Sequence, residues 1–191
     1  MHIEKSVIEE KTTNNTDNRQ GISIRKYTPT QELINNIPYI TMTVLGAAIF
    51  IVAFSGSALS LSAAGAYLIY GIAGAVWIMI FVCPYCRYFD TRECPCGYGH
   101  IAAKFRNKES IECFSDKFKK HIPVIVPLWF IPLLAGIPVA VFNFSWTLLA
   151  LLTIFAVVAF VVLPLVSTKH GCKECPQKDS CPWMKTRAKS A

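Results

Sequence analysis

Four long runs of apolar residues restrict the fold of this chain more than any other feature. None of them contains Asp, Glu, Lys, Arg or His, and they cover Ile37–Phe54, Ala58–Val82, Ile122–Phe142 and Trp146–Val166. A helix of about 20 residues crosses a hydrocarbon core about 30 Å thick. Core helices of soluble proteins rarely extend this far without a charge, so we predict four transmembrane helices.

The links between the apolar runs are short within each half of the chain. Residues 55–57 join the first two runs, and residues 143–145 join the last two. These links predict two antiparallel transmembrane hairpins, 37–82 and 122–166, in an all-α membrane protein. The composition agrees, because only 16% of the residues are charged, whereas soluble domains have about 25%.

The basic residues predict the orientation in the membrane. All 19 Lys and Arg residues lie in the segments 1–36, 83–121 and 167–191, and the net charge is +7. The positive-inside rule therefore puts both termini and the central loop in the cytoplasm, in a multi-pass protein of the cell inner membrane. We expect these charges to face anionic membrane lipid, and no nucleic-acid-binding motif is present.

Two short helices are predicted in the polar segments. The segment 1–36 is polar and partly disordered by composition, but Thr28 and Gln31 form a capping box that predicts a short interfacial helix before the first span. In the Cys-rich loop 83–121, apolar residues recur at spacings of three and four, which predicts an amphipathic helix lying on the membrane. These apolar residues are Ile111, Phe114 and Phe118.

All eight cysteines lie in the two segments that follow the second and fourth apolar runs. The loop contains Cys83, Cys86, Cys94, Cys96 and Cys113, and the tail 167–191 contains Cys172, Cys175 and Cys181. Structural disulfides are rare in a reducing cytoplasm, whereas thiolates bind zinc and iron–sulfur clusters. We therefore predict that the loop and the tail form a small metal-binding cap in which all eight cysteines are ligands.

Eight cysteines are enough for two four-cysteine iron–sulfur clusters, which we expect to be of the 4Fe–4S type. The tail spacing from Cys172 to Cys181, with two and then five intervening residues, resembles the auxiliary-cluster spacing of SPASM domains. That resemblance covers about ten residues and implies no radical chemistry here. The chain is then an electron-transfer subunit of a membrane redox complex, with a membrane or cytoplasmic redox protein and a quinone-like carrier as partners.

The spacing also suggests how the ligands divide between two sites. Four loop cysteines lie close together in the chain and form the first predicted site: Cys83, Cys86, Cys94 and Cys96. The three tail cysteines need a fourth ligand, and we assign Cys113 to that position, with His170 as the rival.

Two other functions remain open at this stage. The pairs Cys83/Cys86 and Cys172/Cys175 could share one zinc ion, which would make the protein a zinc-stapled membrane adaptor or assembly factor without redox activity. The motif Cys83-Pro84-Tyr85-Cys86 resembles the dithiol motif of glutaredoxins, and with four spans it is similar to quinone-linked disulfide-forming proteins, which instead face the oxidising side. No catalytic residue is identified. The apolar runs lack His and carboxylates, which argues against a membrane-embedded bis-histidine haem and against ion transport.

Overall fold

The computed structural model describes residues 26–172, 175, 177, 181 and 182, and these residues form helices and turns without any strand. Within them, four helices are long and apolar enough to cross a membrane, as the apolar runs predict. They are Pro29–Ala53, Ala58–Tyr85, Ile111–Phe142 and Trp146–Lys169. Residues 1–25, on which the prediction of N-terminal disorder falls, lie outside the described part.

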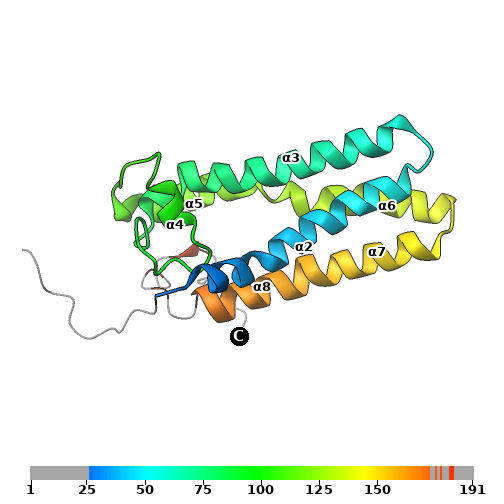
Figure 1. The fold of residues 1–191 in the computed structure, drawn as a ribbon. Coiled ribbons are helices and arrows are strands. Elements are labelled where there is room, and N and C mark those ends of the chain that lie inside the picture. The colour runs from blue at the N-terminus through cyan, green and yellow to red at the C-terminus, as the bar shows by residue number, and fades with distance from the viewer. Residues whose placement is uncertain (1–25, 173–174, 176, 178–180, 183–191) are drawn as a thin grey trace, which may run out of the picture.

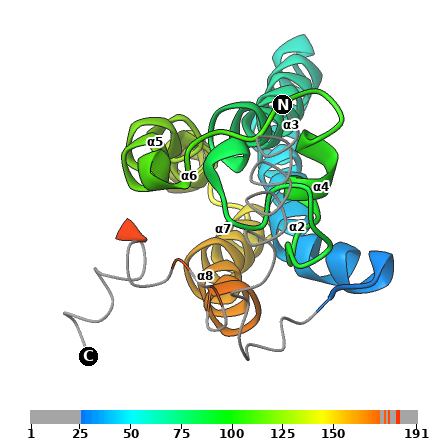
Figure 2. The same ribbon diagram turned by 90° about the vertical axis from the view of Figure 1, so that its left-hand side faces the viewer.

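Helix α2 is the centre of the bundle, and it packs against three other long helices (Figures 1 and 2). The bounds are α2 Pro29–Ala53, α3 Ala58–Phe81, α6 Pro127–Phe142 and α7 Trp146–Val157. Helix α2 begins well before the apolar run because Thr28 and Gln31 form the capping box that the sequence predicts. The expected interfacial helix and the first span are therefore one continuous helix.

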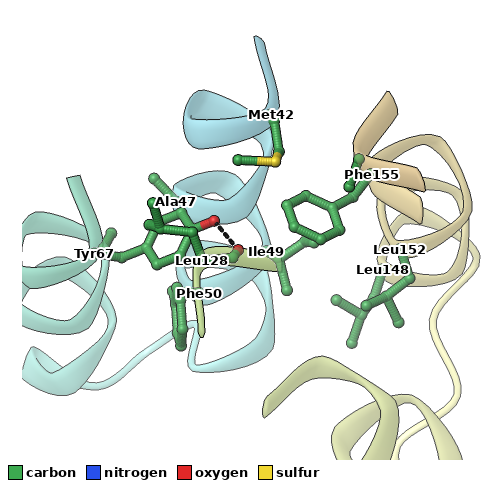
Figure 3. Packing of buried hydrophobic residues seen from close by; sticks show 11 residues of the cluster. Met42, Ala47, Ile49, Phe50, Tyr67, Leu128, Leu148, Leu152 and Phe155 are labelled. Atoms are coloured by element: carbon green, nitrogen blue, oxygen red, sulfur yellow. Dashed lines mark hydrogen bonds between the residues drawn. The ribbon is translucent and has the colours of Figure 1, made fainter. Parts of the chain in front are cut away.

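The buried cluster between these helices is shown in Figure 3. On α3 only one face is buried, at positions three or four residues apart: Ser60, Ala64, Tyr67, Gly71 and Gly74. A Cβ atom on Gly46 of α2 would overlap the ring of Tyr67. Small residues thus let α2 and α3 approach closely, which is how helices gain packing energy in lipid.

The third span contains prolines, and a neighbouring helix compensates for one of them. The amphipathic helix α5 (Phe114–His121) leads through a 3-10 turn (Ile122–Val124) into α6, and Pro132 lies inside α6. Because Pro132 has no N–H, it cannot donate to the carbonyl oxygen of Leu128. The hydroxyl of Tyr67 donates to that oxygen instead, at 2.6 Å (Figure 3). Hydrocarbon offers no water to replace this bond.

The fourth span changes its helical register around a proline. After α7, a π-helical turn at Val158–Val162 precedes the short helix α8 (Leu163–Val166), and a second π-helical turn covers Ser167–Cys172. Pro164 lacks the N–H that an α-helix needs at this point, and its ring would clash with the carbonyl of the preceding turn. The wider π register just before it relieves that clash.

The cysteine-bearing loop and the start of the tail lie at the same end of the bundle as the start of α2 (Figure 1). The short links 54–57 and 143–145 lie at the opposite end. Figure 2 looks onto the first end, where the loop, α4 (Tyr98–Ala102) and α5 surround the ends of the long helices. The segments that carry the described Lys and Arg residues all belong to this end.

Candidate metal centre

The loop begins with a tight turn that places two cysteines at the end of α3. Residues Cys83–Tyr85 form a 3-10 turn, which Pro84 favours at its first positions, and the N–H of Cys86 donates to the carbonyl of Cys83 at 3.0 Å. Cys83 is buried together with Phe89 and Ala102, and these three form a small core between α3 and the loop. The turn is thereby fixed against the bundle.

A second turn, around Cys94, depends on two glycines. Gly97 has a φ of +73°, a left-handed conformation that favours glycine. A Cβ atom on Gly99 would lie 2.5 Å from the backbone carbonyl oxygen of Tyr88, so no larger residue fits there. This close approach lets the N–H of Gly99 donate to Sγ of Cys94 at 3.5 Å.

Helix α2 holds this part of the loop through two adjacent asparagines. The side-chain amide of Asn35 donates to the carbonyl of Pro95 at 2.8 Å, and that of Asn36 donates to the carbonyl of Cys96 at 3.0 Å. The backbone N–H of Tyr27 also donates to the carbonyl of Arg92 at 2.8 Å. Three hydrogen bonds thus tie residues 92–96 to the beginning of α2.

The tail meets the loop through Gln177. Its buried side chain accepts a hydrogen bond from the backbone N–H of Arg87 at 3.0 Å, although the two residues are 90 positions apart. Next to this contact, Cys175 lies close enough to Cys86 and Cys94 for their thiolate charges to interact. The structure therefore brings Gln177 and Cys175 of the tail to the loop, whereas the metal-binding cap stays a prediction.

Six cysteines converge in this way from the loop and the tail. They are Cys83, Cys86, Cys94, Cys96, Cys175 and Cys181, and electrostatic interactions connect them. Two of their sulfurs also accept backbone N–H groups two residues further on, since Tyr88 donates to Cys86 and Gln177 donates to Cys175. With the Gly99 bond to Cys94, three of the six thiols receive a backbone amide, which stabilises negative charge on sulfur.

Burial governs the protonation of Cys86 and Cys175 in the absence of a cation. Mainly because of burial, the pKa of Cys86 rises to about 12, although the N–H of Tyr88 partly opposes the rise. Burial also raises the pKa of Cys175. Both groups are neutral thiols near pH 7 unless a cation favours the thiolate, so metal uptake here would release protons.

The described cysteines do not form a complete site for a single metal ion. In the part of the chain that the structure describes, no three His, Cys, Asp or Glu side chains are close enough to hold one ion. Four sulfurs on one tetrahedral zinc lie only about 3.8 Å apart, given a Zn–S bond of about 2.3 Å. A 4Fe–4S cluster binds each cysteine through a different iron atom, which spreads the four sulfurs further apart.

The remaining predicted ligands are not part of this group. Cys113 is exposed, has no electrostatic interaction with another described cysteine, and lies at the end of the 3-10 turn before α5. The side chains of Cys172 and His170 fall outside the described part of the chain. Cys175 and Cys181 thus interact electrostatically with loop cysteines, and their assignment to a second site with Cys113 stays a prediction.

Sequence reasoning missed the residues that hold the site together. Asn35 and Asn36 directly precede the first apolar run. Two adjacent side-chain amides at the end of a membrane span indicate hydrogen bonds to a neighbouring polar segment. Gln177 carries no comparable signal, because its partner is a backbone N–H far away in the chain. Comparison with protein-family models, with curated proteins and with solved structures finds no match for this chain.

Proposed function

We propose that the chain is an integral membrane iron–sulfur protein that transfers electrons as a subunit of a membrane redox complex. The observation that carries this proposal is the convergence of six cysteines from two distant segments at one end of the bundle. Three of these sulfurs accept backbone amides, and hydrogen bonds to sulfur are one of the means by which proteins set the potential of a cluster.

A bound cluster would supply one-electron chemistry, and the chain would hold it and shield it. The loop turns present the sulfurs, while the buried side chains of Tyr88 and Phe89 limit the access of water from the loop side. Limited solvent access and N–H···S hydrogen bonds both affect the reduction potential of a bound cluster, and here both would act on the same group of cysteines. No described side chain is needed as an acid or a base for this role.

The proposal includes the architecture of two antiparallel hairpins carrying one cytoplasmic cap. In this proposal the eight cysteines bind two 4Fe–4S clusters, with Cys113 as the fourth ligand of the tail site, and His170 is the alternative to Cys113. The loop and tail face the cytoplasm because the basic residues lie beside them. The partners are a cytoplasmic or membrane redox protein and membrane lipid.

Anaerobic purification with iron, sulfide and zinc analysis tests the cofactor. We expect brown protein with about eight irons and eight sulfides per chain, the content of two 4Fe–4S clusters, and an electron paramagnetic resonance signal after reduction with dithionite. Cys94→Ser should lower the iron content and change that signal. Cys113→Ser should remove the other cluster and retain the signal of the cluster that contains Cys94, because Cys113 is assigned to the site of the tail cysteines. Colourless wild-type protein with stoichiometric zinc would refute the proposal in favour of a zinc-stapled adaptor.

Membrane labelling tests the orientation. Single reporter cysteines at Gly56 or Ser145, in a variant without its own cysteines, should react with an impermeant maleimide only from the outer side. A reporter at Lys108 should react only from the cytoplasmic side. The opposite pattern would contradict the proposed orientation.

A further inference from the structure

A cavity of about 180 Å³ lies directly beside the cysteine group, between α2, α3, the start of the third span and α8. Cys96 and Tyr98 line its loop side, and Asn35 and Asn36 line it from α2. The rest of its lining is mostly apolar and includes Ala75, Ile78, Ile125 and Leu163, with Tyr39 and Ser167 as its polar members. A cavity of roughly 150 Å³ is large enough to bind a benzene ring, so this one accommodates a six-membered ring.

Several polar groups in the cavity are left for a ligand. The hydroxyl of Tyr98 makes no hydrogen bond within the described part of the chain. Asn35 and Asn36 use their amide N–H groups on the loop, and their side-chain oxygens have no donor there. The cavity thus offers one hydroxyl donor and two amide acceptors at one side and hydrocarbon at the other. A ligand that fits must carry ring oxygens and also dissolve in the membrane.

We propose that this cavity binds the ring of a lipid-soluble quinone, which exchanges electrons with the cysteine-held cluster at Cys96. The inference rests on the proposed iron–sulfur function and specifies its membrane partner. Tyr98 donates a hydrogen bond to a quinone carbonyl, and the oxygens of Asn35 and Asn36 accept from the hydroxyls of the quinol. The quinone tail lies along the apolar walls toward the membrane interior.

The exchange balances in both atoms and electrons. If the proposed clusters are bound, they would supply the two electrons that reduce the quinone, one at a time, and cytoplasmic water would supply two protons. The two quinone carbonyls would become two hydroxyls as the two electrons leave the clusters. The cytoplasmic redox protein of the proposed function replaces the electrons.

Binding of decylubiquinone to the purified protein in lipid nanodiscs tests the inference, with quenching of tryptophan fluorescence as the readout. Ala75→Leu adds bulk inside the cavity and should weaken binding at least about tenfold, the effect of losing roughly 1.4 kcal/mol of contact. Ala73→Leu is the matched control, because this residue lies on the same helix but is exposed, and it should bind as the wild type does. Tyr98→Phe keeps the ring and removes one hydrogen bond, so binding should weaken about threefold to tenfold.

A competitor without oxygens separates a quinone site from a lipid-chain site. Decylbenzene has a similar ring and tail, and it should not displace the quinone. Absence of quinone binding, equal binding by Ala75→Leu and wild type, or full displacement by decylbenzene would each overturn the inference. Iron analysis of the same samples tests the proposed function separately: iron with no quinone binding refutes only the cavity assignment, whereas wild-type protein without iron refutes the electron-transfer function.

Discussion

The bond from Tyr67 to the carbonyl that Pro132 leaves unpaired gives a sharp test of the fold. Tyr67→Phe removes only the hydroxyl, because a phenylalanine ring still packs over Gly46 and beside Phe50, whose ring centroid lies 5.6 Å away. The carbonyl of Leu128 then loses its donor inside the bundle. An unsatisfied buried carbonyl costs about 1–3 kcal/mol, and measured side-chain hydrogen bonds in membrane proteins contribute about 0.6–1.7 kcal/mol. We expect Tyr67→Phe to lower the free energy of unfolding by about 1–2 kcal/mol.

A double-mutant cycle isolates the role of the proline. Pro132→Ala restores a backbone N–H that can donate to the Leu128 carbonyl, so Tyr67→Phe should cost under about 0.5 kcal/mol in that background. The free energy of unfolding can be measured by titration with sodium dodecyl sulfate in mixed micelles, with tryptophan fluorescence as the signal. The coupling between the two positions should be about 1 kcal/mol, which exceeds the usual error of additivity.

Tyr70 provides the control for this cycle. Its hydroxyl donates to the carbonyl of Val124, which lies too far back in the chain to accept an α-helical hydrogen bond from the N–H that Pro132→Ala restores. The cost of Tyr70→Phe should therefore be the same in the wild-type and in the Pro132→Ala background. If Tyr67→Phe also costs the same in both backgrounds, the Tyr67 hydroxyl does not compensate for the proline, and the reasoning is refuted.

Three further perturbations follow from close contacts. Gly99→Ala would bring a methyl group to 2.5 Å from the Tyr88 carbonyl oxygen, so it should lower the iron bound per chain; Gly65→Ala, which meets nothing within 4 Å, should leave iron unchanged. Gln177→Ala removes the acceptor for the Arg87 N–H. In the metal-free protein, maleimide should then modify Cys175 faster, as mass spectrometry would show. Exposed Cys113 should react at an unchanged rate and serves as the control. Gly136→Ala would place a Cβ atom 2.8 Å from Leu152 and 2.9 Å from Ile49, so it should cost about 1–3 kcal/mol of stability, and an unchanged unfolding curve would contradict the packing.

The membrane helices could be predicted because their determinants are local. An uncharged run of about 20 residues needs no information from the rest of the chain to be recognised as a span. The capping box at Thr28 and Gln31 is also recognisable from neighbouring residues alone, and it predicts where the helix begins. It does not reveal that this helix continues without a break into the first span. The π-helical turns near Pro164 depend on how a long helix absorbs a missing donor, and residue type alone does not determine that choice.

The composition of the candidate site was predictable, but its internal arrangement was not. The clustering of cysteines after the second and fourth spans predicts which residues lie together at one end of the bundle, and the structure has the described loop cysteines and Cys175 at that end. Which cysteines lie together depends on where the tail passes the loop. The hydrogen bond from the Arg87 N–H to the Gln177 side chain fixes that position, and the sequence does not reveal it. Counting cysteines in fours predicts that Cys113 joins the tail cysteines; in the structure Cys113 is exposed and Cys175 interacts with Cys86 and Cys94, a contact that the spacing does not reveal.

The contact between the tail and the loop also sets an order of events during biosynthesis. Residue 87 leaves the ribosome long before residue 177, and the third and fourth spans must enter the bilayer between them. The loop cysteines are thus in place, with their thiols still without tail partners, throughout the insertion of the second half of the protein. A chain terminated before residue 175 would therefore contain all four spans and the four interacting loop cysteines, but neither Cys175 nor Cys181.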